Sequence, residues 1–231
     1  MSAVYAPYLS DVVEIRGEEY HHLTRSLRIR VGERVWLTDG KGLLALGEVQ
    51  WISRGVAEVK VIQRLERPGE PPAPVGVVVP PLRQPARLDW LVEKAVELGV
   101  TAIYLLPMER SVSRRVDVSR LERVAIAALK QNLRSTLPEI RLLHSWEAVP
   151  WQGYVHHLMG EIGATVFLEE ALPLTPAPTL WIVGPEGDFS EKELRLLKER
   201  QVQGVSLGHL RLRAETAAIF FLSVLKAQWK Y

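Results

Sequence analysis

Apolar and polar residues alternate with a period of two through much of the first 65 residues, which is typical of half-buried β-strands. Val35–Thr38 and Leu43–Gln50 are two such segments. They flank the sequence DGKG at 39–42, which suits a tight hairpin turn. Ala57–Leu65 alternates in the same way. The pattern therefore predicts a β-barrel over about the first 70 residues.

One helical segment interrupts this β pattern, at HHLTRSLR in positions 21–28. Its two leucines are four residues apart and are predicted to share the buried side. His21, Arg25 and Arg28 have the spacing i, i+4 and i+7, so they are predicted to share another side of the helix.

Proline and glycine are dense at residues 66–74, which marks a linker. After it, short apolar runs alternate with amphipathic helical segments, and this alternation predicts a parallel sheet covered on both faces. The expected strands are Val75–Val79, Ala102–Leu106, Glu139–Leu143, Thr165–Leu168, Leu180–Val183 and Val205–Leu207. The expected helices are Arg87–Leu98, Ser119–Leu133, one that Ser190 opens in a capping box with Glu193, and Ala214–Gln228.

Two of the expected strands end in glycine-containing loops that lead directly into helices. One loop contains GPEG at 184–187, and the other begins with LG at 207–208 and continues to LRAET at 212–216. Because ligands bind at the carboxyl ends of strands in open α/β sheets, we expect one composite pocket. Glycine lets backbone approach a ligand closely, so Gly187 is expected to face that ligand. Taken alone, the first loop is more simply a strand-to-helix turn, and it is the second loop that favours a shared pocket.

Composition excludes several kinds of site. The absence of cysteine excludes disulfides and thiolate metal sites, and two adjacent histidine pairs diverge, so no metal is expected. The sequence lacks GxGxxG, the P-loop and GxSxG. It has neither a signal-peptide pattern nor an apolar run near the roughly 18 residues of a membrane helix. We therefore expect a cytoplasmic α/β protein with no membrane partner.

Basic residues are concentrated between positions 110 and 134. Seven basic residues lie there against two acids. They are Arg110, Arg114, Arg115, Arg120, Arg123, Lys130 and Arg134. A local excess of this kind neutralises phosphates, although a solvated helix face explains it equally well.

Six segments, in order, resemble the RsmE family of SPOUT-class methyltransferases, which form N3-methyluridine in 16S ribosomal RNA. They are HHLTRSLR, RLDWLVEKAVELGV, ERSVSRR, LKQNLRSTLPEI, GPEGDFS and LGHLRLRAETA. The resemblance implies a PUA-like, RNA-binding β-barrel at residues 1–70. It also implies a SPOUT methyltransferase α/β domain at 71–231, with a parallel sheet and a C-terminal trefoil knot. S-adenosylmethionine is the implied cofactor, and the implied partner is 16S rRNA within the 30S subunit.

A homodimer is implied as well. The last expected helix is apolar around most of its circumference, so it must be buried on several sides. Some of that burial is expected across a two-fold axis.

The resemblance also carries expectations for individual residues. Arg213 is expected to stabilise negative charge on the uracil oxygens, and Glu186 or Glu215 to accept the N3 proton. Capping the helix and binding loop amides remain open structural roles for these two glutamates. The expected cofactor-binding residues are Leu168, Val183, Gly184, Pro185, Glu186, Gly187, Ser206, Leu207, Gly208, Leu212 and Thr216. The expected RNA-binding residues are His21, Arg25, Arg28, Arg110, Arg114, Arg115 and Arg134.

The chain departs from the family pattern in both loops. Asp188 replaces the last glycine of GPEGG, and Leu210 and Arg211 stand where the family has arginine and isoleucine. The family's EQSxR segment reads KQNLR at 130–134. Two other functions stay open: a SPOUT enzyme acting on a tRNA ribose hydroxyl, and a non-enzymatic RNA-binding protein with a degenerate cofactor pocket. The barrel-first order disfavours the former, and the intact loop glycines disfavour the latter.

Overall fold

A computed structural model describes residues 2–231, and the chain forms two compact units. The first contains the residues up to Glu70 together with Ala125–Leu137. The second contains Pro71–Val124 and Pro138–Tyr231. Helix α3 (Val118–Asn132) therefore begins in the second unit and ends in the first.

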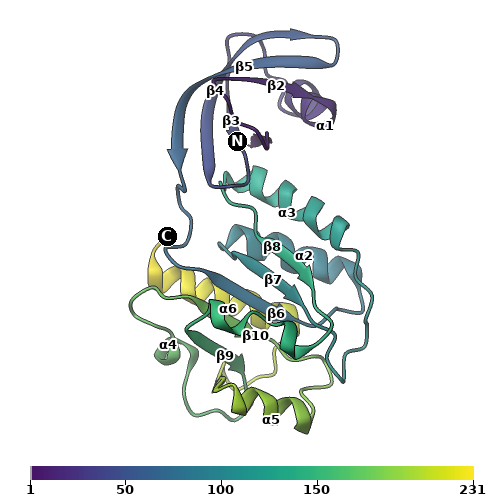
Figure 1. The fold of residues 1–231 in the computed structure, drawn as a ribbon, viewed down its shortest axis with the longest axis vertical. Helices are drawn as coiled ribbons and strands as arrows, with labels where there is room; N and C mark the ends of the chain where they lie inside the picture. Colours follow the sequence, from purple (N-terminus) through teal and green to yellow (C-terminus); the bar gives the residue numbers. More distant parts are fainter. Residues whose placement is uncertain (1) are drawn as a thin grey trace. The chain divides into compact units, whose positions relative to one another are not determined.

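The first unit is built on a curled five-stranded sheet with the order β1-β3-β4-β5-β2. Its strands are β1 (Ala3–Tyr5), β2 (Val12–Arg16), β3 (Arg34–Thr38), β4 (Leu43–Ser53) and β5 (Val56–Glu66). The hairpin predicted from Val35–Thr38 and Leu43–Gln50 is confirmed by the antiparallel pairing of β3 with β4. Figure 1 shows the long β4–β5 hairpin bending along its length. The bend follows from register shifts at Leu46/Gly47 and Val49/Trp51, because an extra residue on one strand bends and twists the pair.

The helical segment of this unit differs in detail from the prediction. It comprises α1 (Gly17–His21) and one π-helical turn, η1 (His22–Ser26). Leu23 is fully buried in the core, as expected. Arg28 lies beyond the helix in the left-handed region, with φ of 56°. The predicted common side for His21, Arg25 and Arg28 is therefore wrong, although all three side chains are exposed.

A buried ion pair joins the linker to the segment that follows α3. Arg134 Nη2 lies 2.6 Å from Glu70 Oε2, with side chains only 7% and 1% exposed. The backbone amides of Ser135 and Thr136 each donate to Glu70 Oε1 at 2.9 Å. Because its guanidinium is buried, the predicted contact of Arg134 with RNA phosphate is a wrong expectation. Although Arg134 lies in a basic segment of the sequence, its partner is a carboxylate of the protein itself.

These contacts decide the ionisation of Glu70. Burial alone would raise the pKa of its carboxyl, but the hydrogen bonds and charge of Arg134 and the two backbone amides lower that pKa below its ordinary value. The carboxylate is thus held in its charged form by its surroundings.

The second unit contains a six-stranded, fully parallel sheet with the order β11-β9-β10-β6-β7-β8. Its strands are β6 (Val75–Val79), β7 (Ala102–Leu105), β8 (Glu139–Leu142), β9 (His156–Gly160), β10 (Thr179–Ile182) and β11 (Gln203–Val205). Its helices besides the start of α3 are α2 (Pro85–Glu97), α4 (Leu168–Ala171), α5 (Glu191–Glu199) and α6 (Ala214–Trp229), with single 3-10 turns at η2 (Trp146–Ala148) and η3 (Trp151–Gly153). The predicted parallel sheet is confirmed.

One expected strand is wrong and one was missed. Within Thr165–Leu168, Phe167 forms a single bridge to Ser206, and Leu168 already begins α4. The missing strand is β9, which pairs with both β10 and β11. Its first two residues are histidines, so its sequence does not have the continuous apolar run of a buried parallel strand.

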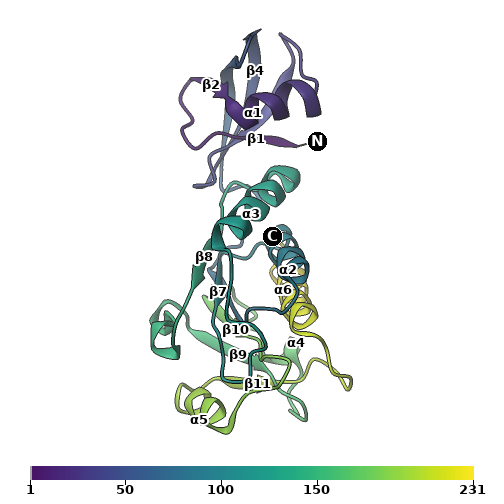
Figure 2. The ribbon, with the colours of Figure 1, turned by 90° about the vertical axis from the view of Figure 1, so that its right-hand side faces the viewer.

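The helices α2 and α6 lie on one face of this sheet, and α5 lies on the other (Figure 2). Trp181 of β10 stacks on Phe221 of α6, with ring centroids 4.7 Å apart and ring planes at 3°. Phe220 on the same helix stays 40% exposed. The helix is thus buried on most sides but keeps an apolar flank uncovered. Within residues 2–231, no helix is long and apolar enough to cross a membrane.

Candidate functional site

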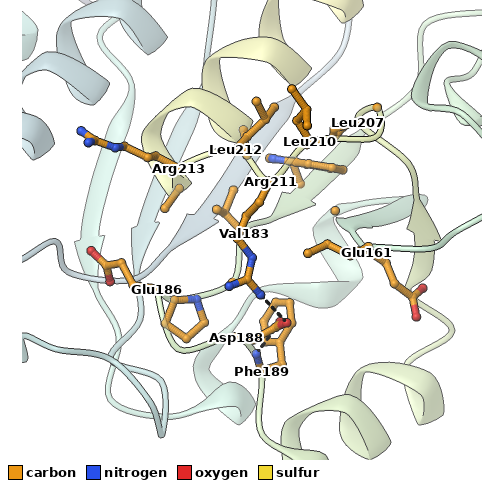
Figure 3. A pocket seen from close by; sticks show the side chains of 18 of the residues that line it. Glu161, Val183, Glu186, Asp188, Phe189, Leu207, Leu210, Arg211, Leu212 and Arg213 are labelled. Atoms are coloured by element: carbon orange, nitrogen blue, oxygen red, sulfur yellow. Dashed lines mark hydrogen bonds and ion pairs between the residues drawn. The ribbon is translucent and has the colours of Figure 1, made fainter.

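A pocket of about 350 Å³ lies where β9, β10 and β11 lead into their loops (Figure 3). Its size falls in the usual range for small-molecule sites. Three loop segments and the start of α6 form it, together with Arg87 from α2. The lining residues are Arg87, Gly160, Glu161, Ile162, Trp181, Val183, Gly184, Pro185, Glu186, Asp188, Phe189, Leu207, Gly208, Leu210, Arg211, Leu212, Arg213, Ala214 and Ala217. The predicted composite pocket at the strand ends is therefore present.

The deep side of the pocket is apolar. Trp181 and Ala217 contribute there, and Trp181 is fully buried. Its indole Nε1–H has no hydrogen-bond partner among the described residues. Buried donors are normally satisfied, so this nitrogen is an exception to the usual pairing of buried polar atoms. The apolar part of the lining suits an apolar ring of a bound small molecule.

The structure brings together some of the predicted residues and leaves others outside the lining. Those that line the pocket are Val183, Gly184, Pro185, Glu186, Leu207, Gly208, Leu212 and Arg213. Those outside its lining are Leu168, Gly187, Ser206, Glu215 and Thr216. Leu168 and Ser206 are buried and support the second loop, because Leu168 N donates to Ser206 O at 3.2 Å and Ser206 Oγ accepts from Gly208 N at 3.2 Å. Thr216 is exposed.

The close backbone approach expected at Gly187 involves the protein itself. A Cβ at Gly187 would lie 3.0 Å from Arg110 Cβ and 3.3 Å from Arg110 O. Arg110 Nη1 in turn donates to the carbonyls of Gly187 and Phe189, each at 3.3 Å. Arg110, expected to bind RNA, thus braces the first loop. A side chain at 187 would disturb this brace before it reached a ligand.

The departure at position 188 has a conformational explanation. Asp188 has φ of 64°, in the left-handed region that favours glycine. Aspartate is among the few other residues that adopt this region, so the loop keeps its shape without the family's glycine. In the second loop Gly208 has φ of 109°, and no atom lies within 4 Å of where its Cβ would be. Here only glycine meets the backbone requirement.

Arg87 contacts both predicted catalytic carboxylates, those of Glu186 and Glu215, and the three side chains form one ion cluster. It donates to both oxygens of Glu215, from Nε at 2.8 Å and from Nη2 at 2.6 Å. Its Nη1 lies 3.6 Å from Glu186 Oε1. The hydrogen bonds that Arg87 donates to Glu215 raise the pKa of the Arg87 guanidinium above its ordinary value. Burial alone would raise the pKa of Glu215, but Arg87 lowers it on balance. A carboxylate stabilised in this way is a weaker base, which argues against Glu215 as the proton acceptor.

Four more charged side chains lie around the rim: Glu161, Asp188, Arg211 and Arg213. Arg211 Nη2 lies 3.5 Å from Asp188 Oδ2, while the Arg213 side chain points in a different direction (Figure 3). Arg213 occupies the N-cap position of α6 and is exposed. In the same view Glu161 points away from Asp188.

Some lining residues were not predicted from the sequence, for two reasons. Gly160, Glu161 and Ile162 follow β9, the strand that was not predicted. The short run Leu158–Gly160 was the available signal, and the adjacent histidines obscured it. Arg87 was missed because its partner Glu215 lies 128 positions away in the chain.

The remaining predicted RNA contacts are exposed. Arg114 and Arg115 lie between β7 and α3, and His21, Arg25 and Arg28 lie in the first unit. Within residues 2–231 no group of three or more His, Cys, Asp or Glu side chains is arranged to hold a metal ion.

Comparison with known proteins shows which family the chain belongs to. A family model described as RNA methyltransferase domain matches residues 69–226. A second, described as RNA methyltransferase PUA domain, matches residues 15–62. A protein from Mycobacterium bovis named ribosomal RNA small subunit methyltransferase E is 31% identical over 243 residues, covering 96% of this chain and 90% of the relative. The chain belongs to this RsmE family of RNA methyltransferases.

Other RsmE relatives extend the likeness to three dimensions. The Bacillus subtilis enzyme of the same name is 28% identical over 230 residues, covering 93% of this chain and 89% of its own. The crystal structure of RsmE from Neisseria gonorrhoeae bound to S-adenosyl methionine matches with a TM-score of 0.87 and 27% identity, over 99% of this chain and 98% of that one. A methyltransferase from Legionella pneumophila in complex with the same cofactor has a TM-score of 0.85 and 27% identity, over 97% and 96% of the two chains.

Proposed function

We propose that this protein uses S-adenosylmethionine to methylate N3 of a uridine in 16S ribosomal RNA of the small ribosomal subunit. The observation that carries the proposal is the composite pocket: two strand-end loops enclose an apolar surface, and guanidinium groups lie at the rim. Family membership supports the reaction class, and two structurally similar proteins bind this cofactor. The specificity for N3 of uridine rests on the RsmE resemblance.

The pocket residues fit the cofactor by their chemistry. Trp181, Leu207 and Leu212 would form an apolar surface for the adenine end and exclude water around it. When bound, S-adenosylmethionine supplies a methyl group made electrophilic by its sulfonium centre. The loops hold that group, and their glycines keep side chains out of the space.

Arg213 would act on the uracil ring. Loss of the N3 proton spreads negative charge over O2 and O4, and a guanidinium at the N-terminus of α6 stabilises that charge as it develops. Glu186, which lines the pocket, would accept the proton directly or through water. Glu215 would have a positioning role, because Arg87 occupies both of its oxygens.

The two sequence regions would have different functions. Residues 1–70 would bind RNA as a PUA-like domain, and residues 71–231 would bind the cofactor and transfer the methyl group. His21, Arg25, Arg28, Arg114 and Arg115 would contact phosphates, because these basic side chains are exposed. Ribosomal RNA as substrate implies action in the cytoplasm.

We also propose that the C-terminal segment forms the family's trefoil knot and that the protein is a homodimer. The chain leaves β11 at the sheet edge, yet α6 packs against α2 and β6, which supports a path past the neighbouring loops. The uncovered Phe220 on α6 and Trp90 on α2, 40% and 43% exposed, support burial against a second copy.

The test is incubation of the protein with small subunits from a strain lacking this methylation and with methyl-labelled cofactor. Nucleoside mass spectrometry should detect labelled N3-methyluridine from 16S RNA. Label on a ribose 2′-hydroxyl, or no transfer while cofactor binds, would contradict the proposal. A Gly208→Val variant is the matched control, since a side chain at this φ strains the loop.

A further inference from the structure

Asp188 and Arg211, on opposite loops at the rim of the pocket, form a loose ion pair. Their closest atoms lie 3.5 Å apart, and the side chains are 56% and 65% exposed. Charge-assisted hydrogen bonds are typically about 2.7–2.9 Å long, so this contact is a weak one. Exposed pairs of this kind contribute little to stability. Both groups therefore retain capacity to bind a charged ligand.

The other charged groups around the pocket make closer contacts within the protein. Arg87 holds Glu215 through two short hydrogen bonds and also lies near Glu186. The Glu161 carboxylate packs against Gly204, where an added Cβ would clash with it. Asp188 and Arg211 are thus the oppositely charged side chains at the rim that can most readily exchange each other for a charged ligand.

The backbone fixes where the Asp188 carboxylate points. Asp188 has a left-handed backbone conformation, and its Oδ1 accepts from Phe189 N at 2.9 Å, which orients the carboxylate. The other oxygen faces Arg211 (Figure 3). Position 188 is a glycine in the family pattern, and Arg211 stands one position after the family's arginine. Two departures from that pattern, 23 positions apart, therefore contact each other.

We propose that Asp188 and Arg211 bind the amino-acid end of S-adenosylmethionine, with Arg211 contacting its carboxylate and Asp188 its α-ammonium group. The inference rests on the proposed function and extends it to a subsite. The apolar deep side of the pocket suits the adenine end, which leaves the charged rim for the zwitterion. A zwitterion offers each member of the pair an opposite charge, so the exchange leaves no charge unpaired.

Calorimetry with three probes tests this subsite: S-adenosylmethionine, its decarboxylated analogue and 5′-methylthioadenosine, which lacks the amino-acid end. The wild-type protein should bind the complete cofactor about tenfold more tightly than the decarboxylated analogue, as expected for loss of one charged hydrogen bond. Arg211→Gln should bind these two probes equally. Arg195→Gln, an exposed arginine on α5, is the matched control and should behave as wild type.

Asp188→Asn tests the other half, because asparagine also adopts the left-handed region and keeps the loop in place. It should weaken the complete cofactor about tenfold while leaving methylthioadenosine unaffected. Full discrimination by Arg211→Gln, or equal weakening of all probes by Asp188→Asn, would overturn the subsite while leaving the proposed function standing. Failure of the wild-type protein to bind any probe would remove both.

Discussion

The partner of a glutamate decides what chemistry it performs, and Glu215 is the example in this protein. Its side chain is 8% exposed, and Arg87 donates to both of its oxygens. Truncating one member of such a buried pair leaves the other charge without compensation. Glu215 therefore connects the start of α6 to α2, and the positioning role proposed for it rests on this contact.

Replacing this carboxylate should separate positioning from proton transfer. Glu215→Gln is expected to lower thermal stability and weaken S-adenosylmethionine binding several-fold, because Arg87 loses a charged partner. The acidic limb of the pH–rate profile should stay in place. Calorimetry, thermal melts and the pH profile measure these effects, with exposed Glu199→Gln as control. A lost pH limb with unchanged stability would instead make Glu215 the base.

Arg213 should show the opposite behaviour. A group that stabilises charge only in the transition state lowers turnover more than ground-state binding. Arg213→Ala is expected to lose roughly 100-fold in methylation rate, with RNA and cofactor affinities little changed. Single-turnover kinetics on small subunits measures the rate, and Arg195→Ala is the control. Normal turnover, or a defect confined to RNA binding, would make Arg213 a phosphate contact only.

At the scale of elements, the Glu70–Arg134 pair links the chain after β5 to the chain after α3. Glu70→Ala should lower the free energy of unfolding by about 3 kcal/mol, because it leaves a buried guanidinium unpaired. The stabilisation also depends on pH. The folded-state pKa of Glu70 is lowered, so its contribution is present above the ordinary value of 4.5 and is lost as pH falls through the folded value.

Denaturation of both proteins between pH 7 and pH 3 measures this contribution. The stability difference between wild type and Glu70→Ala should shrink as the solution becomes acidic. A difference that stays constant across this range would mean that packing, and not charge, accounts for the effect.

Periodicity predicts most elements and few of their polar contacts. The apolar run of β6 and the Ser190–Glu193 capping box were readable because the signal is local. Strand β9 could not be predicted in this way, since its burial depends on neighbouring strands on both sides in the sheet. The burial of Arg134 had the same cause: its partner lies 64 positions earlier, and nothing local distinguishes it from a solvated arginine.

At the scale of the whole molecule, binding of RNA should depend on exposed basic residues of the first unit. Arg25→Ala or Arg28→Ala should weaken RNA binding and reduce the salt slope by about one, with cofactor affinity unchanged. Arg134→Ala is the informative comparison: it should lower stability without altering the slope, because its charge is already paired. Filter binding across a salt series measures the slopes. An unchanged slope in both Arg25→Ala and Arg28→Ala would exclude these phosphate contacts.

Assembly is the second property at this scale. If the exposed flank of α6 meets a second copy, sedimentation at micromolar concentration should give twice the 26.1 kDa chain mass. Phe220→Glu should shift the equilibrium towards monomer, because a charge would then be buried in an apolar contact. A wild-type monomer at that concentration would contradict the homodimer.

The first compact unit includes residues 125–137, which lie more than fifty positions beyond the linker in the sequence. A fragment cut after the linker would keep the Glu70 carboxylate but lose the arginine that neutralises it and the two backbone amides that donate to it. It would also lose Lys130, which pairs with Glu19 at 2.7 Å. The first unit is therefore not one continuous stretch of the sequence. Any exchange of this unit with that of another protein has to include both stretches of the chain.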